Sequence, residues 1–117
     1  MNQSNLLLRV ADFSLTPGPR YRSEGKFSAE EFREDVLLPQ VQAAVKSKAT
    51  LTVILDGVHG YGTSFFEASF GGLIRENNFS LADLDLTLRL VSEEVPRYLE
   101  EIRHYMEQAE SEGPANG

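Results

Sequence analysis

The sequence contains no cysteine, few basic residues and no long apolar run. The absence of cysteine excludes disulfides, thiol catalysis and thiolate metal sites, and it fits a cytoplasmic setting. No apolar run approaches the roughly 20 residues that a membrane-spanning helix needs. The first residues, Met1 to Asn5, carry none of the basic residues that open a secretory signal. We therefore expect a soluble, cytoplasmic protein.

The chain is short of positive charge. Acidic residues outnumber basic ones by 18 to 11, which gives a formal net charge of −7. Much of the acidic excess lies between Glu93 and Glu112. A surface with this charge repels the phosphates of nucleic acids and anionic lipid, so we expect neither a nucleic acid nor a membrane as a partner.

The length of 117 residues suits one domain with a single hydrophobic core. We expect this domain to span residues 1–110, and residues 111–117 to form a flexible tail. Strands and helices are predicted to alternate, which favours an α/β fold whose sheet is at least partly parallel. In chain order, the predicted elements are a strand at 6–13, a helix after Ser28, a strand at 50–56, a helix at 64–75, a strand at 84–90 and a helix at 94–110.

Local signals support these assignments. Ser28 and Glu31 have the spacing of a capping box, and Pro39 should kink or split the helix that follows. Residues 50–56 are apolar on both faces, as in a central strand covered on both sides, with one side covered either fully or only in part. Leucine alternates with polar residues over 84–90, which predicts a half-buried strand. The apolar residues that should face inward from the first long helix are Phe32, Val36, Leu37, Val41, Ala44 and Val45.

The loop after the predicted central strand carries the most information about function. Residues 57–64, with the sequence GVHGYGTS, nearly match the phosphate-binding pattern Gly-x-x-x-x-Gly-Lys-Ser/Thr between a strand and a helix. Thr63 stands where that pattern has its lysine, whose charge holds the β- and γ-phosphates. We therefore reject an NTPase. The free amides at a helix N-terminus still attract anions.

Two hydroxyl groups lie at the start of the next helix. Ser64 and Glu67 form a second Ser-x-x-Glu pair, so an N-cap alone explains Ser64. Thr63 is not needed for that cap and is the better candidate for an exposed, modifiable hydroxyl. Glu67, Gly71 and Arg75 share the outer face of this helix, while Phe66 and later apolar residues face inward.

The remaining polar residues do not assemble a catalytic set. Asp56 ends the buried strand without a second carboxylate beside it, and a turn-forming Asp-Gly is its favoured role. His59 is isolated and is predicted to be a surface contact. Arg20 and Arg22 flank Tyr21 in a loop, which fits either a solvated turn or a guanidinium clamp for an anion. We expect no enzymatic activity, no metal and no cofactor.

The residues also carry a family resemblance. The most specific string is GTSFFEASFGGL at 62–73, and weaker support comes from PGPR at 17–20, EGKFS at 24–28 and EFR at 31–33. On these residues, the stretch from about 9 to 91 resembles the STAS-like family of bacterial domains. The resemblance implies a mixed β-sheet packed against α-helices.

More distantly, the chain is similar to bacterial anti-sigma-factor antagonists. These STAS domains bind a GHKL-type serine kinase and are switched by phosphorylation within the motif Asp-Ser-Ser-Gly-Leu-Gly. On this chain, Gly62 takes the aspartate position, Thr63 the phosphoacceptor position, Ser64 the second serine and Phe65 the glycine. The resemblance implies a regulatory binding role.

Two hypotheses follow. The first is a non-enzymatic regulatory module that binds a protein partner, such as a GHKL-type ATPase or kinase, through residues 57–67 and is switched by phosphorylation of Thr63 or Ser64. The predicted partner-binding residues are His59, Tyr61, Gly62, Phe66 and Glu67. The alternative is a small-ligand sensor that holds a nucleotide or another anion at the N-terminus of the 64–75 helix, with Arg20 or Arg22 closing over it.

Overall fold

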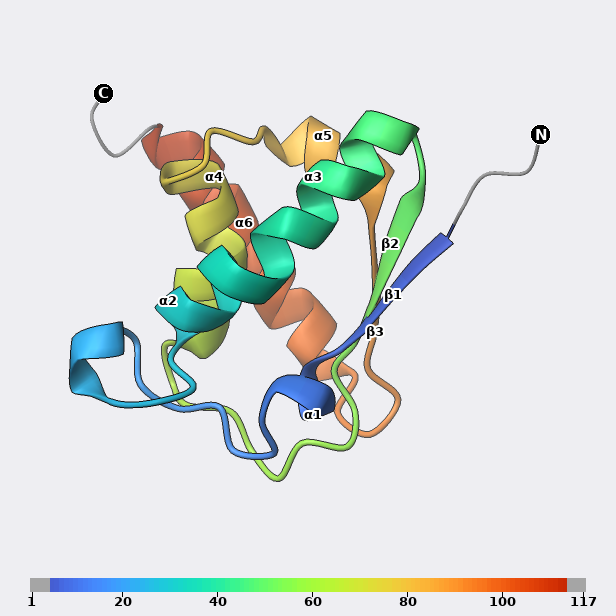
Figure 1. Cartoon of the computed structure of the whole chain (residues 1–117). Helices are drawn as coiled ribbons and strands as arrows, with labels where there is room; N and C mark the ends of the chain where they lie inside the picture. Colours follow the sequence, from blue (N-terminus) through green and yellow to red (C-terminus); the bar gives the residue numbers. More distant parts are fainter. Residues whose placement is uncertain (1–4, 114–117) are drawn as a thin grey trace.

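Three parallel strands organise the chain, which a computed structural model describes over residues 5–113 (Figure 1). They are β1 (Asn5–Arg9), β2 (Thr50–Ile54) and β3 (Leu88–Val91), in the spatial order β1-β2-β3. The expected α/β class and the central position of β2 are confirmed. Both pairings in the described sheet are parallel, whereas the family resemblance implied a mixed sheet.

The helices gather on one side of this sheet (Figure 1). Two long helical stretches are composite. The first consists of α2 (Ala29–Glu31), the π-helical η2 (Phe32–Leu37) and α3 (Leu38–Ser47), and the second includes the π-helical η3 (Glu67–Gly71) and α4 (Gly72–Arg75). The other helices are α1 (Val10–Phe13), η1 (Arg22–Glu24), α5 (Leu81–Thr87) and α6 (Arg97–Glu112).

The first long helix begins at the predicted Ser28 cap, although the Glu31 carboxylate reaches back to the Phe27 amide and not to the Ser28 amide of a capping box. The Glu31 amide donates to Ser28 Oγ at 3.0 Å, and the Glu31 carboxylate accepts from the Phe27 amide at 3.0 Å. Pro39 neither splits nor ends the helix, because the chain widens into the π-helical η2 just before it. A wider turn accommodates a residue that lacks an N–H and whose ring crowds the preceding turn. Val45, which was expected to face inward, is 44% exposed.

The segment before β3 differs from its predicted strand. Residues 81–87 form helix α5, because Ser80 caps it by accepting from the Asp83 amide at 3.0 Å. Leu84 is buried, while Leu86 on the opposite side is 83% exposed. The strand therefore starts only at Leu88.

Both ends of the described chain also depart from expectation. The first strand stops at Arg9, and residues 10–13 turn into the short α1. Helix α6 continues to Glu112, so the expected flexible tail is wrong for residues 111 and 112. Residues 1–4 and 114–117, which carry the predicted start of the domain and the rest of the tail, lie outside the described residues.

The hydrophobic core lies between the sheet and the helices. Its largest fully buried side chains are Phe32, Phe65, Phe70, Leu37, Leu51, Leu55, Leu73, Leu84, Ile102, Val10, Val41 and Val53. Helix α6, which the sequence predicts at 94–110, contributes Ile102, Met106 and Ala109 to this core. Within residues 5–113, none of the helices has the length and apolar composition that crossing a membrane would require.

Candidate functional site

The loop that leaves β2 is fixed first by Asp56. Its carboxylate accepts from the amides of Glu93 and Glu94 at 3.0 and 2.9 Å, and the Glu94 carboxylate accepts from the Gly57 amide at 2.9 Å. Gly57 has a φ of +85°, a conformation that strains residues with a Cβ. Asp56 therefore joins the loop after β2 to the loop after β3, a structural role that goes beyond the predicted Asp-Gly turn.

The same loop is fixed a second time by the segment before η1. The His59 amide donates to the Leu15 carbonyl at 2.7 Å, and the Gly62 amide donates to the Pro17 carbonyl at 3.0 Å. A Cβ added to Gly62 would lie 2.3 Å from the Gly18 carbonyl oxygen, so no other residue fits without a backbone shift. The His59 side chain, by contrast, is exposed.

Tyr61 anchors the loop to the core. Its hydroxyl donates to the Leu55 carbonyl at 2.8 Å, and its ring lies 4.5 Å from the Phe66 ring and 5.3 Å from the Tyr98 ring, between centroids. Burial raises the pKa of the Tyr61 phenol above its ordinary value, because the charged phenolate would lose solvation there. Phe66 is also buried, at 4% exposure.

Thr63 lies in the turn just before the helix that begins at Phe65, and it is exposed, as predicted. It borders a shallow groove of about 410 Å³ between the helix start and α6. Arg97, at the start of α6, lines the same groove and pairs with Glu101 at 3.3 Å. The groove is lined by Tyr61, Gly62, Thr63, Phe66, Arg97, Tyr98, Glu101 and Tyr105.

Ser64 does not form the predicted capping box. The Glu67 carboxylate points away from it and pairs with Arg20 and Arg75, each at 2.5 Å. The Ser64 backbone carbonyl accepts from the Ala68 amide at 3.0 Å, so Ser64 starts the helix through its main chain. The Ser64 side chain is half-buried, and Thr63 is the more accessible hydroxyl.

Glu67 thus joins three segments of the chain. Arg20 comes from the loop before η1, and Arg75 comes from the end of α4, two turns after Glu67. Arg75 also donates to the Glu67 carbonyl at 3.3 Å. The Glu67 side chain is only 23% exposed, so most of it is used within the domain.

Arg20 and Arg22, the candidate anion clamp, both face carboxylates of this chain. Arg22 pairs with Glu34 at 3.1 Å and with Asp35 at 2.8 Å, on η2. Neither arginine lines the groove beside Thr63. A ligand at the helix start would reach these guanidinium groups only after the carboxylate pairs had opened, and the clamp stays a prediction.

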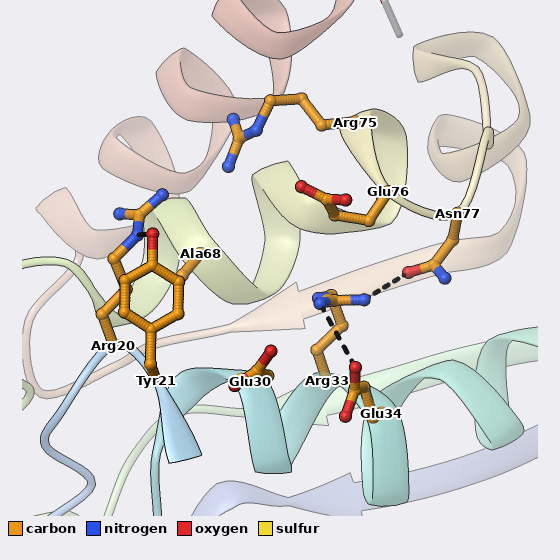
Figure 2. Close-up of a pocket in the computed structure, with 9 residues that line it drawn as sticks. All are labelled: Arg20, Tyr21, Glu30, Arg33, Glu34, Ala68, Arg75, Glu76 and Asn77. Atoms are coloured by element: carbon orange, nitrogen blue, oxygen red, sulfur yellow. Dashed lines mark hydrogen bonds and ion pairs between the residues drawn. The ribbon is translucent and has the colours of Figure 1, made fainter. Parts of the chain in front are cut away.

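A second cavity, of about 360 Å³, lies beside these ion pairs (Figure 2). Arg33, which the sequence reasoning missed, reaches into it from η2 and donates to Asn77 Oδ1 at 2.9 Å. Its Nη2 lies 3.8 Å from Glu34. Figure 2 shows Arg20 and Tyr21 at one end of the cavity, and Arg33 with Asn77 at the other. Three arginines and three glutamates line it, so their charges balance and the cavity does not favour anions.

Comparison with known protein families shows which family the chain belongs to. A family model described as a STAS-like domain of unknown function (DUF4325) matches residues 28–96, more than half of the chain. The chain belongs to this family. The match includes β2, the loop after it, the helix from Phe65 to Arg75 and β3, but not the loop that carries Arg20. No curated protein and no solved structure matches the chain.

Proposed function

We propose that this STAS-like domain is a non-enzymatic regulatory module that binds a protein partner through residues 57–67. The observation that carries the proposal is the exposed Thr63 at the edge of a groove that contains aromatic side chains. Tyr61 and Tyr98 are half-buried there, and aromatic side chains with polar tips are enriched at protein interfaces. The resemblance to anti-sigma-factor antagonists suggests a GHKL-type ATPase or kinase as the partner.

The engagement of the loop's polar groups supports a binding role over an enzymatic one. Asp56 accepts hydrogen bonds from two backbone amides, and Tyr61 donates one to a backbone carbonyl. Glu67 forms ion pairs with two arginines. A general acid or base must be within reach of the proton that it transfers, and these groups already face partners within the domain. The loop is therefore built as a rigid surface.

Phosphorylation of Thr63 would switch this surface. A phosphate adds about −1.5 to −2 charges at neutral pH. It would stand at a helix start, where negative charge is favourable, and in the groove lined by Arg97. The charge of the groove would then change for any partner that contacts it.

Variants at two exposed positions test the proposal without damage to the core. A Cβ at Gly60 would meet no atom within 4 Å, so Gly60→Arg adds bulk to the loop surface at little cost to the fold. Leu86→Arg, at an 83% exposed position on α5, is the matched control. Phe66 is unsuitable because truncation of a buried ring would unfold part of the domain.

Quantitative affinity purification from the native cells should compare wild type, Gly60→Arg, Leu86→Arg and Thr63→Glu. We expect Gly60→Arg and Thr63→Glu to lose a partner that wild type and Leu86→Arg retain. Mass spectrometry of the native protein should find phosphate on Thr63 rather than Ser64. Identical partner sets for all four proteins would contradict the proposal.

The same variants separate this function from the small-ligand sensor. A thermal-shift screen of nucleotides and phosphorylated metabolites would reveal a ligand, because one present at 100 times its Kd adds about 2.7 kcal/mol to the free energy of unfolding. A shift in wild type that Arg20→Ala abolishes would favour the sensor and count against the protein-binding proposal.

A further inference from the structure

Within residues 5–113, no helix covers the face of the sheet opposite the helices. Side chains alternate between the two faces of a strand, and Leu8, Leu51 and Val53 point into the core. The intervening residues point outward, and Leu7 among them is 52% exposed. Figure 1 shows α2, α3, α4 and α6 on one side of the strands, with no described helix on the other.

An open face is unusual for a sheet of this kind. Sheets whose strands are all parallel occur almost only with both faces covered. The outward residues Thr52 and Ile54 of β2 are β-branched, a type that packs well on a covered sheet surface, and both are half-buried. The described domain therefore lacks a layer that its sheet is suited to receive.

Two rows of outward residues cross all three strands. The strand register places Leu7, Thr52 and Arg89 in one row, and Arg9, Ile54 and Val91 in the next. The two arginines stand on opposite outer strands and are exposed, and within residues 5–113 neither has an ion-pair partner. No outward position of the three strands carries a carboxylate. This face thus combines three apolar side chains, Leu7, Ile54 and Val91, with two arginines, and it is locally positive on a chain of net charge −7.

We propose that the open sheet face binds an acidic amphipathic helix of a partner protein. The two outer strands lie about 10 Å apart, twice the usual strand spacing, and a helix with its side chains is about 10–12 Å wide. A helix along β2 would set its apolar stripe on Leu7, Ile54 and Val91. Arg9 and Arg89 would then stand on its two flanks and meet its carboxylates.

A second copy of this chain is the less favourable occupant. Two such faces packed together would bring arginines against arginines with no carboxylate between them, and like charges brought together cost binding free energy. The proposed surface is separate from residues 57–67, so it stands or falls independently of the function proposed above.

The test uses two stapled helical peptides of about 14 residues, long enough to cover the sheet. Both carry the same leucine stripe, flanked by glutamates in one peptide and by lysines in the other. We expect the full chain to bind the glutamate peptide about tenfold more tightly than the lysine peptide. The net charge of −7 alone would favour the lysine peptide, so this preference would have to come from the arginines of the sheet face. Amide NMR shifts should map to residues 5–9, 50–54 and 88–91.

Charge reversal provides the decisive comparison. The double variant Arg9→Glu/Arg89→Glu should reverse the preference in favour of the lysine peptide. The control Lys26→Glu/Lys46→Glu changes the net charge by the same amount at exposed positions outside the sheet and should leave the preference unchanged. Absence of peptide binding, a preference that the double variant does not change, or shifts confined to residues 57–67 would overturn the proposal. So would a dimer of the wild-type chain in light scattering that Leu7→Asn dissolves.

Discussion

Arg33 lies directly against Gly72. A Cβ added at Gly72 would stand 2.7 Å from Arg33 Nε and 2.8 Å from its Cδ, closer than real side chains approach. Gly72 has ordinary helical backbone angles, so any residue could adopt its conformation, and glycine is needed there only to leave room for Arg33. Gly72 therefore accommodates an almost fully buried arginine that joins η2 to the end of α4 through Asn77.

We predict that Gly72→Ala destabilises the domain, although alanine favours a helix over glycine by about 1 kcal/mol. Displacement of the buried Arg33 side chain should lower the free energy of unfolding by about 1–3 kcal/mol, as overpacking does. Urea denaturation measures this change. In an Arg33→Ala background the same substitution should cost much less, because the clash is gone. A neutral or stabilising Gly72→Ala in the wild-type background would contradict this account.

The pairing of Glu67 with Arg20 and Arg75 leads to a second prediction. Glu67→Gln leaves two partly buried guanidinium groups without their shared carboxylate, and we expect a loss of about 1–3 kcal/mol in the free energy of unfolding. Glu100→Gln, at an exposed position of α6, is the matched control and should change stability by less than about 0.5 kcal/mol. Equal effects of the two substitutions in thermal or urea denaturation would show that the Glu67 pairs contribute nothing.

The sequence predicted those parts of the fold that short-range patterns determine. β2 is a run of β-branched and apolar residues, and the Ser28 cap needs only its neighbour Glu31. The alternation of leucines over 84–90 was misleading, because Leu81 and Leu84 also satisfy a helical spacing and Ser80 supplies the cap. The helix signal was therefore present and was outweighed by the strand pattern.

The site was harder to predict because its contacts link distant parts of the chain. Glu67 was assigned to a local cap, but its real partner Arg20 lies in a loop far earlier in the sequence. Asp56 was assigned to a turn, and its contacts are two amides that follow the next strand. No local pattern encodes such pairs. The exposure of Thr63, by contrast, followed from its place just outside the helix.

The double hydrogen bond of Asp56 gives a third prediction. Asp56→Ala removes the acceptors for the Glu93 and Glu94 amides and frees the loop between β3 and α6. We expect hydrogen exchange at those two amides to accelerate strongly, while exchange in β2 changes little. Asp12→Ala, at an exposed position on α1, should leave both rates unchanged. Unaltered protection of the two amides in Asp56→Ala would show that other contacts hold the loop.

Tyr61 predicts how stability responds to alkaline pH. Burial raises the pKa of its phenol in the folded domain, while in the unfolded chain it titrates near its ordinary value of about 10. Above that pH the unfolded chain releases this proton and the folded domain keeps it, so the free energy of unfolding falls as pH rises. The contribution is fully present below about pH 10 and is lost progressively above it.

Tyr61→Phe removes the phenol that titrates, so the free energy of unfolding should fall less steeply with rising pH in this variant. The variant also loses the hydrogen bond to the Leu55 carbonyl, so its free energy of unfolding should be lower than that of wild type already at neutral pH. Urea denaturation of both proteins between about pH 8 and 11 measures the two slopes, and parallel slopes would show that Tyr61 is not the group whose burial opposes ionisation.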